Sequence, residues 1–301
     1  MNYRRCGKSG LLLSEIALGF WHNFGSDSDY DNCKAIVECA FDHGITYFDL
    51  ANNYGPPAGS AEVCFGKIMK DVLGSHRDEI VIASKAGHDM WPGPYGEWGS
   101  RKHLMASLDQ SLKRMGLDYV DIFYSHRPDP DTPLEETLQA LVDIVRSGKA
   151  LYAGISKYPP EMAKKAYEYL EERDVRCLVY QGRYNMINRE PEEDILPQVK
   201  EENVGFVAFS PLAQGLLSGK YLNGIPAGSR MTKSVFLNPD VLTPEMMAQL
   251  RTWDAEAREQ GLTMAQYALR WLLKRPEITS VIVGASSPKQ LEDSLGAVMK
   301  K

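Results

Sequence analysis

Strand-like and helix-like segments alternate through almost the whole of this 301-residue chain, and this alternation constrains the fold more than any other feature. Eight short apolar segments are predicted strands: residues 16–20, 46–50, 80–85, 120–126, 150–156, 177–180, 205–210 and 280–284. Several are nearly continuous apolar runs, which is typical of parallel strands covered on both faces. Eight strand–helix units in a chain of this length predict an α/β protein, a (β/α)8 TIM barrel formed by residues 1–301 as one domain.

A doubly wound parallel sheet is the main competing architecture. It usually carries a glycine-rich phosphate-binding turn after its first strand. Here residues 18–22 read LGFWH, which does not match that pattern. Before this strand, residues 3–6 and 11–13 flank the turn GKSG and predict an N-terminal β-hairpin that can close the bottom of a barrel.

Start signals mark several of the predicted helices. Thr132 is the expected N-cap of one helix, with Pro133 in its first turn and Glu135 completing a capping box. Thr263 and Ser287 are expected to begin two later helices in the same way. Two long segments, residues 86–100 and 213–244, interrupt the alternation, and long loops inside a compact domain are usually functional.

Charge and composition argue against several classes of partner. The formal net charge is −6 without a block of like charges, so neither nucleic acid nor a membrane surface is an expected partner. No apolar run has the length of a bilayer span, and the N-terminal residues do not resemble a signal peptide. The five cysteines are scattered without a C-x-x-C pair, which favours reduced thiols and a cytoplasmic protein.

Polar residues end three consecutive predicted strands. Asp49 ends the second strand, Lys85 the third and His126 the fourth, while Tyr54 follows in the loop after Asp49. Alone, each has an ordinary explanation as a turn, surface or loop residue. Because barrel active sites form at the C-terminal ends of the strands, the four residues together predict one site. In it Lys85 pairs with Asp49, and the pair serves Tyr54.

These residue types suit the reduction of a carbonyl group. A phenol is a weak acid at neutral pH, and a nearby ammonium is expected to lower the pKa of Tyr54. Tyr54 is then predicted to donate a proton to the carbonyl oxygen, with His126 hydrogen-bonded to the same oxygen. No side chain can supply hydride, so a nicotinamide cofactor is the expected donor.

Other functions make different demands on the strand ends. A metal-dependent hydrolase would need clustered histidines and carboxylates at the strand ends, and His126 is the only strand-end histidine, so no metal site is predicted. A Schiff-base aldolase that uses Lys85 as its nucleophile stays open, as does a protein that binds the cofactor as a redox sensor.

Several longer motifs match a known family. They are FDLANNYG at 48–55, SKAG at 84–87, SLDQSLKRMGLDYVDIFYSHR at 107–127, SGKALYAGIS at 147–156, FSPLAQGLLSGKY at 209–221 and VIVGASSPKQLEDS at 281–294. With these motifs the chain resembles the aldo-keto reductases over nearly its whole length. Within them it looks most like the branch that holds bacterial L-glyceraldehyde 3-phosphate reductases and potassium-channel β subunits. The resemblance implies a (β/α)8 barrel and catalytic roles for Asp49, Tyr54, Lys85 and His126.

The resemblance also implies a cofactor site, with NADP(H) as the expected cofactor and NAD(H) left open. The implied cofactor-binding residues are Gly19, Trp21, Asp49, Ser156, Gln181, Phe209, Ser210, Pro211, Leu212, Ala213, Gln214, Gly215, Ser218, Lys220, Arg230, Gly284, Ser286, Gln290 and Asp293. Two positions depart from the family pattern. Lys157 follows Ser156 where many members carry Asn, and Gln290 stands where some carry an Arg that contacts the 2′-phosphate.

The activity implied is NADPH-dependent reduction of small aldehydes, such as L-glyceraldehyde 3-phosphate or methylglyoxal, to alcohols. The residues expected to contact the aldehyde or ketone are Trp21, Tyr54, Trp91, His126 and Arg127, with Arg127 placed to meet a phosphate. The alternative is an NADP(H)-binding redox sensor, or an auxiliary subunit like the channel β subunits, with slow turnover. A homo-oligomer is compatible with either activity.

Overall fold

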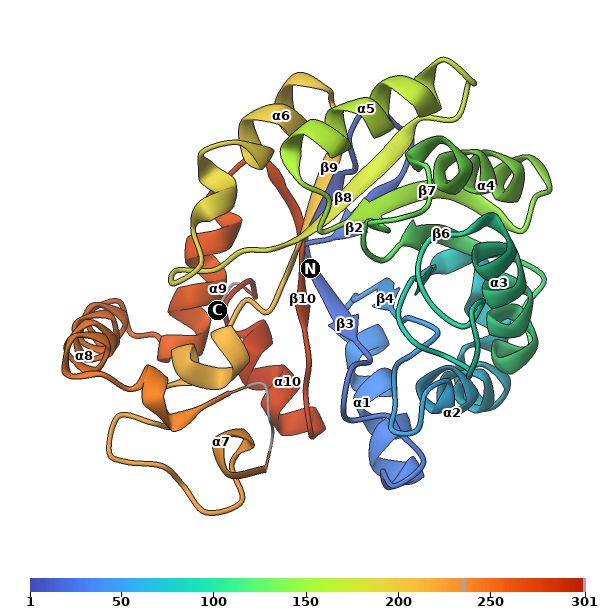
Figure 1. Ribbon diagram of the computed structural model, residues 1–301. Coiled ribbons are helices and arrows are strands. Elements are labelled where there is room, and N and C mark those ends of the chain that lie inside the picture. Colours follow the sequence, from blue (N-terminus) through green and yellow to red (C-terminus); the bar gives the residue numbers. More distant parts are fainter. Residues whose placement is uncertain (234–236, 300–301) are drawn as a thin grey trace.

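Eight parallel strands close into a barrel in the computed structural model, which describes residues 1–233 and 237–299 (Figure 1). Around the barrel they follow the order β10-β3-β4-β5-β6-β7-β8-β9. The strands are β3 (Ile16–Gly19), β4 (Tyr47–Asp49), β5 (Val81–Ala86), β6 (Val120–Ser125), β7 (Ala150–Ser156), β8 (Cys177–Arg183), β9 (Gly205–Phe209) and β10 (Ile278–Val283). The predicted (β/α)8 barrel is therefore confirmed, and each predicted strand is present with ends shifted by a few residues.

Helices surround the barrel and follow the strands in the order that the sequence predicts (Figure 1). The helices are α1 (Tyr30–Asp42), α2 (Ser60–Ile68), α3 (Arg101–Met115), α4 (Leu134–Arg146), α5 (Pro160–Glu171), α6 (Ile195–Glu201), α7 (Arg230–Lys233), α8 (Pro244–Glu259), α9 (Met264–Leu273) and α10 (Pro288–Leu295). Within the described residues, no helix combines the length and the apolar character needed to cross a membrane.

The predicted start of α4 was wrong. Pro133 is the N-cap and no side chain caps this helix, so the capping box at Thr132 does not form. The Thr132 backbone N–H instead donates to a carboxylate oxygen of Asp129, 3.0 Å away, which fixes the turn before the helix. The capping box at Thr263 and the N-cap at Ser287 are both confirmed.

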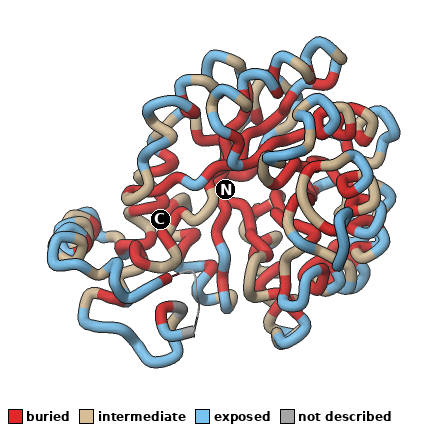
Figure 2. The backbone as a smooth tube through the Cα atoms, in the orientation of Figure 1, coloured by how far each residue is buried: buried red, intermediate tan, exposed pale blue. Residues whose placement is uncertain are grey.

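Alternate residues of each strand face opposite sides, and this divides the core in two. Phe48, Ile82 and Phe123 belong to the layer between the strands and the helices. Tyr47 and Tyr124 belong to a separate apolar cluster together with other inward-facing strand residues. The buried residues accordingly concentrate at the centre of the molecule (Figure 2). Since Asp49 lies two residues beyond Tyr47, it shares the inner face.

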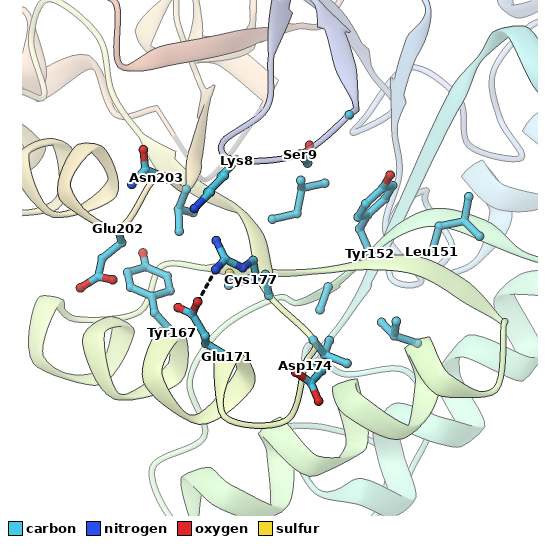
Figure 3. A pocket seen from close by; sticks show the side chains of 17 residues that line it. Lys8, Ser9, Leu151, Tyr152, Tyr167, Glu171, Asp174, Cys177, Glu202 and Asn203 are labelled. Atoms are coloured by element: carbon cyan, nitrogen blue, oxygen red, sulfur yellow. Dashed lines mark hydrogen bonds and ion pairs between the residues drawn. The ribbon is translucent and has the colours of Figure 1, made fainter.

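The predicted hairpin is present as β1 (Tyr3–Arg5) and β2 (Leu12–Ser14), paired antiparallel. A cavity of about 380 Å³ lies beside its turn, with Lys8 and Tyr167 among the lining side chains (Figure 3). Cys177, the first residue of β8, also lines it, so the cavity lies at the N-terminal end of the barrel. The predicted site residues lie at the opposite end, where the strands finish.

Candidate active site

A buried ion pair joins the ends of β4 and β5. The Lys85 Nζ donates to Asp49 Oδ2 at 2.6 Å, and the two side chains are 0% and 2% exposed. The register of the barrel explains the meeting, because Asp49 lies opposite Ala83 and Lys85 follows on the same face of β5. Each charge compensates the other, since neither could remain buried and ionised alone.

The same ammonium also reaches the tyrosine. Lys85 Nζ donates to the Leu50 carbonyl oxygen at 2.6 Å and to the Tyr54 hydroxyl at 3.4 Å. With Asp49 this makes three acceptors for the three N–H groups of a lysine ammonium. An amine that acts as a nucleophile needs a free lone pair, so these contacts argue against Lys85 as a Schiff-base residue.

His126 completes the group from the next strand. Its ring packs edge-on against the Tyr54 ring, with the centroids 5.9 Å apart. The side chain is buried, and its Nδ1 has no hydrogen-bond partner among the described residues. The structure therefore brings Asp49, Lys85, Tyr54 and His126 together at the ends of β4, β5 and β6, as the sequence predicts.

The electrostatics differ from the sequence expectation in one respect. The pKa of Tyr54 is raised well above its usual value, first by burial and then by the charge of Asp49, whereas we expected Lys85 to lower it. Burial is the larger cause, and the Lys85 ammonium does not offset it because it is shared with Asp49, whose negative charge disfavours the phenolate. The pKa of His126 is lowered well below its usual value by burial and then by Lys85. At neutral pH the arrangement thus holds a protonated phenol beside a neutral imidazole.

Two tyrosines that sequence reasoning gave no role support the carboxylate from inside the barrel. The Tyr47 hydroxyl donates to Asp49 Oδ1 at 3.3 Å and lies 2.9 Å from the Tyr124 hydroxyl. Gln181 Nε2 donates to the same carboxylate oxygen at 2.8 Å. The sequence did carry a signal for Tyr47. It lies two residues before Asp49 in the same strand, so the two side chains must face the same side.

Glu62 is a second buried group that sequence reasoning gave no role. It lies in α2, fully buried, accepts a hydrogen bond from Ser84 Oγ at 2.6 Å and pairs with Arg114 at 2.7 Å. Ser84 precedes Lys85, so this contact ties α2 to the strand that carries the lysine. Burial lowers the pKa of Lys85, and the negative charges of Asp49 and Glu62 oppose this effect by favouring the ammonium.

The predicted nicotinamide-binding residues lie at or near the ends of three neighbouring strands. Ser156 ends β7, Gln181 lies beside it in β8, and Phe209 ends β9. The Ser156 Oγ is fully buried and has no hydrogen-bond partner among the described residues. A buried hydroxyl without a partner is costly, and an amide group of a bound cofactor would satisfy it.

The loop after β9 has an unusual backbone. Ser210, Ala213 and Gln214 have φ values of 54°, 45° and 60°, in the left-handed region that non-glycine residues rarely adopt. Asn185, to which sequence reasoning gave no role, donates through Nδ2 to the Ser210 carbonyl oxygen at 2.9 Å. Strained backbone concentrates at ligand sites, and this loop carries the predicted cofactor residues Ser210, Pro211, Leu212, Ala213, Gln214, Gly215 and Ser218.

Lys220 folds back over this loop. A Cβ atom on Gly215, which has a φ of 98°, would lie only 2.8 Å from the Lys220 Nζ. The Ser218 hydroxyl donates to the Gly215 carbonyl oxygen at 2.6 Å. The loop therefore offers an ammonium next to backbone that carries no side chain of its own at Gly215, and this combination suits a diphosphate.

The remaining predicted cofactor residues surround the end of β10. Ser286 donates through its backbone N–H and its hydroxyl to Gln290 Oε1, at 2.7 and 2.8 Å. Open space surrounds the position of a Cβ on Gly284, and the Asp293 carbonyl oxygen accepts from Gln266. Gln290 thus organises the start of α10. Arg230 begins α7, but its side chain lies outside the described part of the structure.

Gly19 is the last residue of β3, and Trp21 lies just after that strand. A Cβ on Gly19 would lie 2.5 Å from the Ile282 side chain, so close packing against β10 by itself requires glycine there. The Trp21 ring packs against the ring of His22 at 3.7 Å. Their contacts with a cofactor or substrate stay predictions.

Two predicted substrate residues, Arg127 and Trp91, are fixed by contacts at the long loop 87–100. Arg127 donates through Nε to the Gly87 carbonyl oxygen at 2.8 Å and pairs with Glu97, while its guanidinium lies 3.7 Å from the Trp98 ring centroid. Trp91 packs on His103 of α3, with ring centroids 4.9 Å apart. Arg127 is thus already paired, and a contact with a substrate phosphate would have to compete with Glu97.

Comparisons with known proteins agree with this geometry. A model of the aldo/keto reductase family matches residues 15–301. The chain is 54% identical over 303 residues to L-glyceraldehyde 3-phosphate reductase of Escherichia coli (strain K12), a match that covers 99% of this chain and 88% of that protein. It is 37% identical over 305 residues to a probable voltage-gated potassium channel subunit beta of Arabidopsis thaliana, covering 99% of this chain and 91% of that protein.

Proposed function

The chain belongs to the aldo/keto reductase family, and we propose that it reduces small aldehydes to alcohols with NADPH, L-glyceraldehyde 3-phosphate and methylglyoxal among them. One observation carries the proposal. The Lys85 ammonium contacts both the Asp49 carboxylate and the Tyr54 hydroxyl, with His126 packed against the tyrosine ring. That arrangement supports proton donation to a carbonyl oxygen.

Each residue then has a defined role. The raised pKa keeps Tyr54 protonated, so its hydroxyl is available as the proton donor. The lowered pKa keeps His126 neutral, so one ring N–H can donate a hydrogen bond that orients the carbonyl oxygen. Lys85 stabilises the phenolate that remains after proton transfer, and Asp49 keeps Lys85 charged. When bound, a nicotinamide cofactor supplies the hydride that no side chain can supply.

The residues at the ends of β7 to β10 fit such a cofactor. The unpartnered Ser156 hydroxyl suits the carboxamide, and Phe209 suits stacking on the ring. Lys220 lies over the strained loop where phosphates would bind, and Arg230 adds a second cation nearby in the sequence. We propose NADP(H) rather than NAD(H) because of these cations, which favour the additional phosphate.

The test is a steady-state assay of NADPH and NADH oxidation with glyceraldehyde 3-phosphate, glyceraldehyde and methylglyoxal. We expect multiple turnovers with NADPH, and a lower kcat/KM when NADH replaces it. Absence of cofactor oxidation with every aldehyde would overturn the proposed activity. Equal kcat/KM with both cofactors would overturn only the preference for NADPH.

A second candidate function follows from the relatives named as potassium channel β subunits. A protein of that kind could hold NADP(H) and turn over slowly. Mixing the NADPH-bound protein with excess aldehyde separates the two, because a sensor would oxidise one equivalent of cofactor and then nearly stop. Sustained oxidation of many equivalents would exclude the sensor.

A further inference from the structure

Lys157 has an unusual backbone conformation at the rim of the barrel. It follows Ser156 at the end of β7 and has a φ of 62°, in the left-handed region that a lysine rarely adopts. Its side chain is exposed at the mouth and reaches the loop after β5, where its Nζ lies 3.4 Å from His88 Nε2. Strain of this kind persists where the surrounding structure or a function requires it.

The position of Lys157 relates directly to the candidate active site. The His88 ring packs edge-on against the His126 ring, with centroids 4.5 Å apart. The Lys157 ammonium is therefore separated from His126 by a single imidazole ring. The Lys157 ammonium also lies 5.7 Å from the Phe209 ring centroid, and the Arg183 guanidinium lies 6.0 Å from the same centroid. Both cations thus lie around the Phe209 ring, and Lys157 is the one that approaches His126, through His88.

Neither cation is neutralised in the described part of the chain. No carboxylate pairs with Lys157 or Arg183 among the described residues, whereas Arg127 pairs with Glu97. The surrounding protein and the charges of Lys85, Arg127 and Arg183 lower the pKa of Lys157 to about 8. An anion bound here would remove this unfavourable crowding of positive charge.

We propose that Lys157, with Arg183 beside it, binds the phosphate of a small phosphorylated aldehyde whose carbonyl group lies at Tyr54 and His126. The inference rests on the proposed function and names the residues that would select this class of substrate. A lysine can bind phosphate as a point charge, without the fixed geometry that a guanidinium requires. Lys157 is the better candidate than Arg127, because it needs no ion pair to break.

The test uses a variant that the backbone favours. Asn tolerates the left-handed region better than Lys, so Lys157→Asn removes the charge without a folding penalty, and its thermal unfolding should match or exceed that of the parent. Lys157→Arg keeps the charge. Lys8→Asn makes the same change in the hairpin turn at the opposite end of the barrel and is the matched control.

The readout is the ratio of kcat/KM for glyceraldehyde 3-phosphate to kcat/KM for glyceraldehyde. In Lys157→Asn we expect this ratio to fall by roughly ten- to a hundredfold, mostly through KM, as for the loss of one charge-assisted bond. Lys157→Arg should retain most of the ratio, and Lys8→Asn all of it. An unchanged ratio, or an equal loss with both substrates, would overturn the inference.

A binding measurement separates this inference from the proposed function. Glycerol 3-phosphate is titrated into the NADPH-bound protein by calorimetry, which needs no turnover. If the protein reduces no aldehyde, the proposed function fails, and weaker binding in Lys157→Asn than in Lys8→Asn would still support the phosphate site. Equal binding by the two variants would overturn it.

Discussion

The Lys85 ammonium lies 2.6 Å from a carboxylate oxygen of Asp49 inside the barrel, and both side chains are almost fully buried. The lysine is also within hydrogen-bonding distance of the Tyr54 hydroxyl, and the carboxylate is held by Tyr47 and Gln181. The pair therefore links the inner core of the barrel to the group that we propose as proton donor. Its disruption should affect both folding and activity.

Lys85→Met should destabilise the protein, because it leaves Asp49 buried without its cation. Removal of one partner of a buried pair typically costs about 3–5 kcal/mol, and the contacts from Tyr47 and Gln181 place the expected loss at the lower end. The double variant with Asp49→Asn should regain part of that stability but no activity. Urea unfolding measures this, and strictly additive losses would contradict the pairing. Lys149→Met, in the exposed pair with Asp109, is the control and should cost less than about 1 kcal/mol.

Gly215→Ala should weaken NADPH binding while the barrel stays folded. The new methyl group would displace the Lys220 ammonium and strain a backbone with a φ of 98°. Gly224→Ala is the matched control, since Gly224 has a φ of 113° but open space around its Cβ position. Both variants should lose some thermal stability. Fluorescence titration with NADPH should show a loss of affinity in Gly215→Ala alone, and an equal loss in both would contradict the role given to this loop.

The kcat/KM for glyceraldehyde 3-phosphate should fall as the pH rises above about 8, because the pKa of Lys157 lies at about 8 in the free protein. Below that pH the lysine is charged and attracts phosphate, and above it the charge is lost. The neighbouring groups are Lys85, Arg127, Arg183 and His88, and the pKa of His88 is lowered to about 4, so it stays neutral over this range. Glyceraldehyde should show no such decline. The same decline with both substrates would place the titration elsewhere.

Much of the fold could be predicted from the sequence because the pattern is redundant. Eight apolar strands that alternate with amphipathic helices are compatible with few folds. In a barrel, polar residues that end three neighbouring strands must then lie at the same rim. Asp49, Lys85 and His126 were predicted to meet on that ground, and the structure brings them together around Tyr54. Local signals were weaker. The capping box expected at Thr132 does not form, because the Thr132 backbone N–H donates to Asp129 instead. The pKa of Tyr54 is raised and not lowered, because the effect of burial exceeds that of the lysine it shares with Asp49.

Features that depend on loop conformation could not be predicted. The pairing of Arg127 with Glu97 and the approach of Lys157 to His88 both require the path of loop 87–100. The left-handed conformation of Lys157 likewise leaves no signal in the sequence, since lysine does not favour it. These contacts decide which cation is available to a substrate, and they were therefore beyond sequence reasoning.

The most direct test of the account is kcat for aldehyde reduction by Tyr54→Phe at saturating NADPH. The substitution removes one oxygen and keeps the ring against His126, so unfolding and NADPH affinity should be preserved. Tyr95→Phe, in the exposed part of loop 87–100, is the control and should keep its activity. Because general acid catalysis contributes about 10²–10⁴-fold, we predict a loss of that size in Tyr54→Phe. A kcat near that of the parent protein would contradict the assignment of Tyr54 as the proton donor.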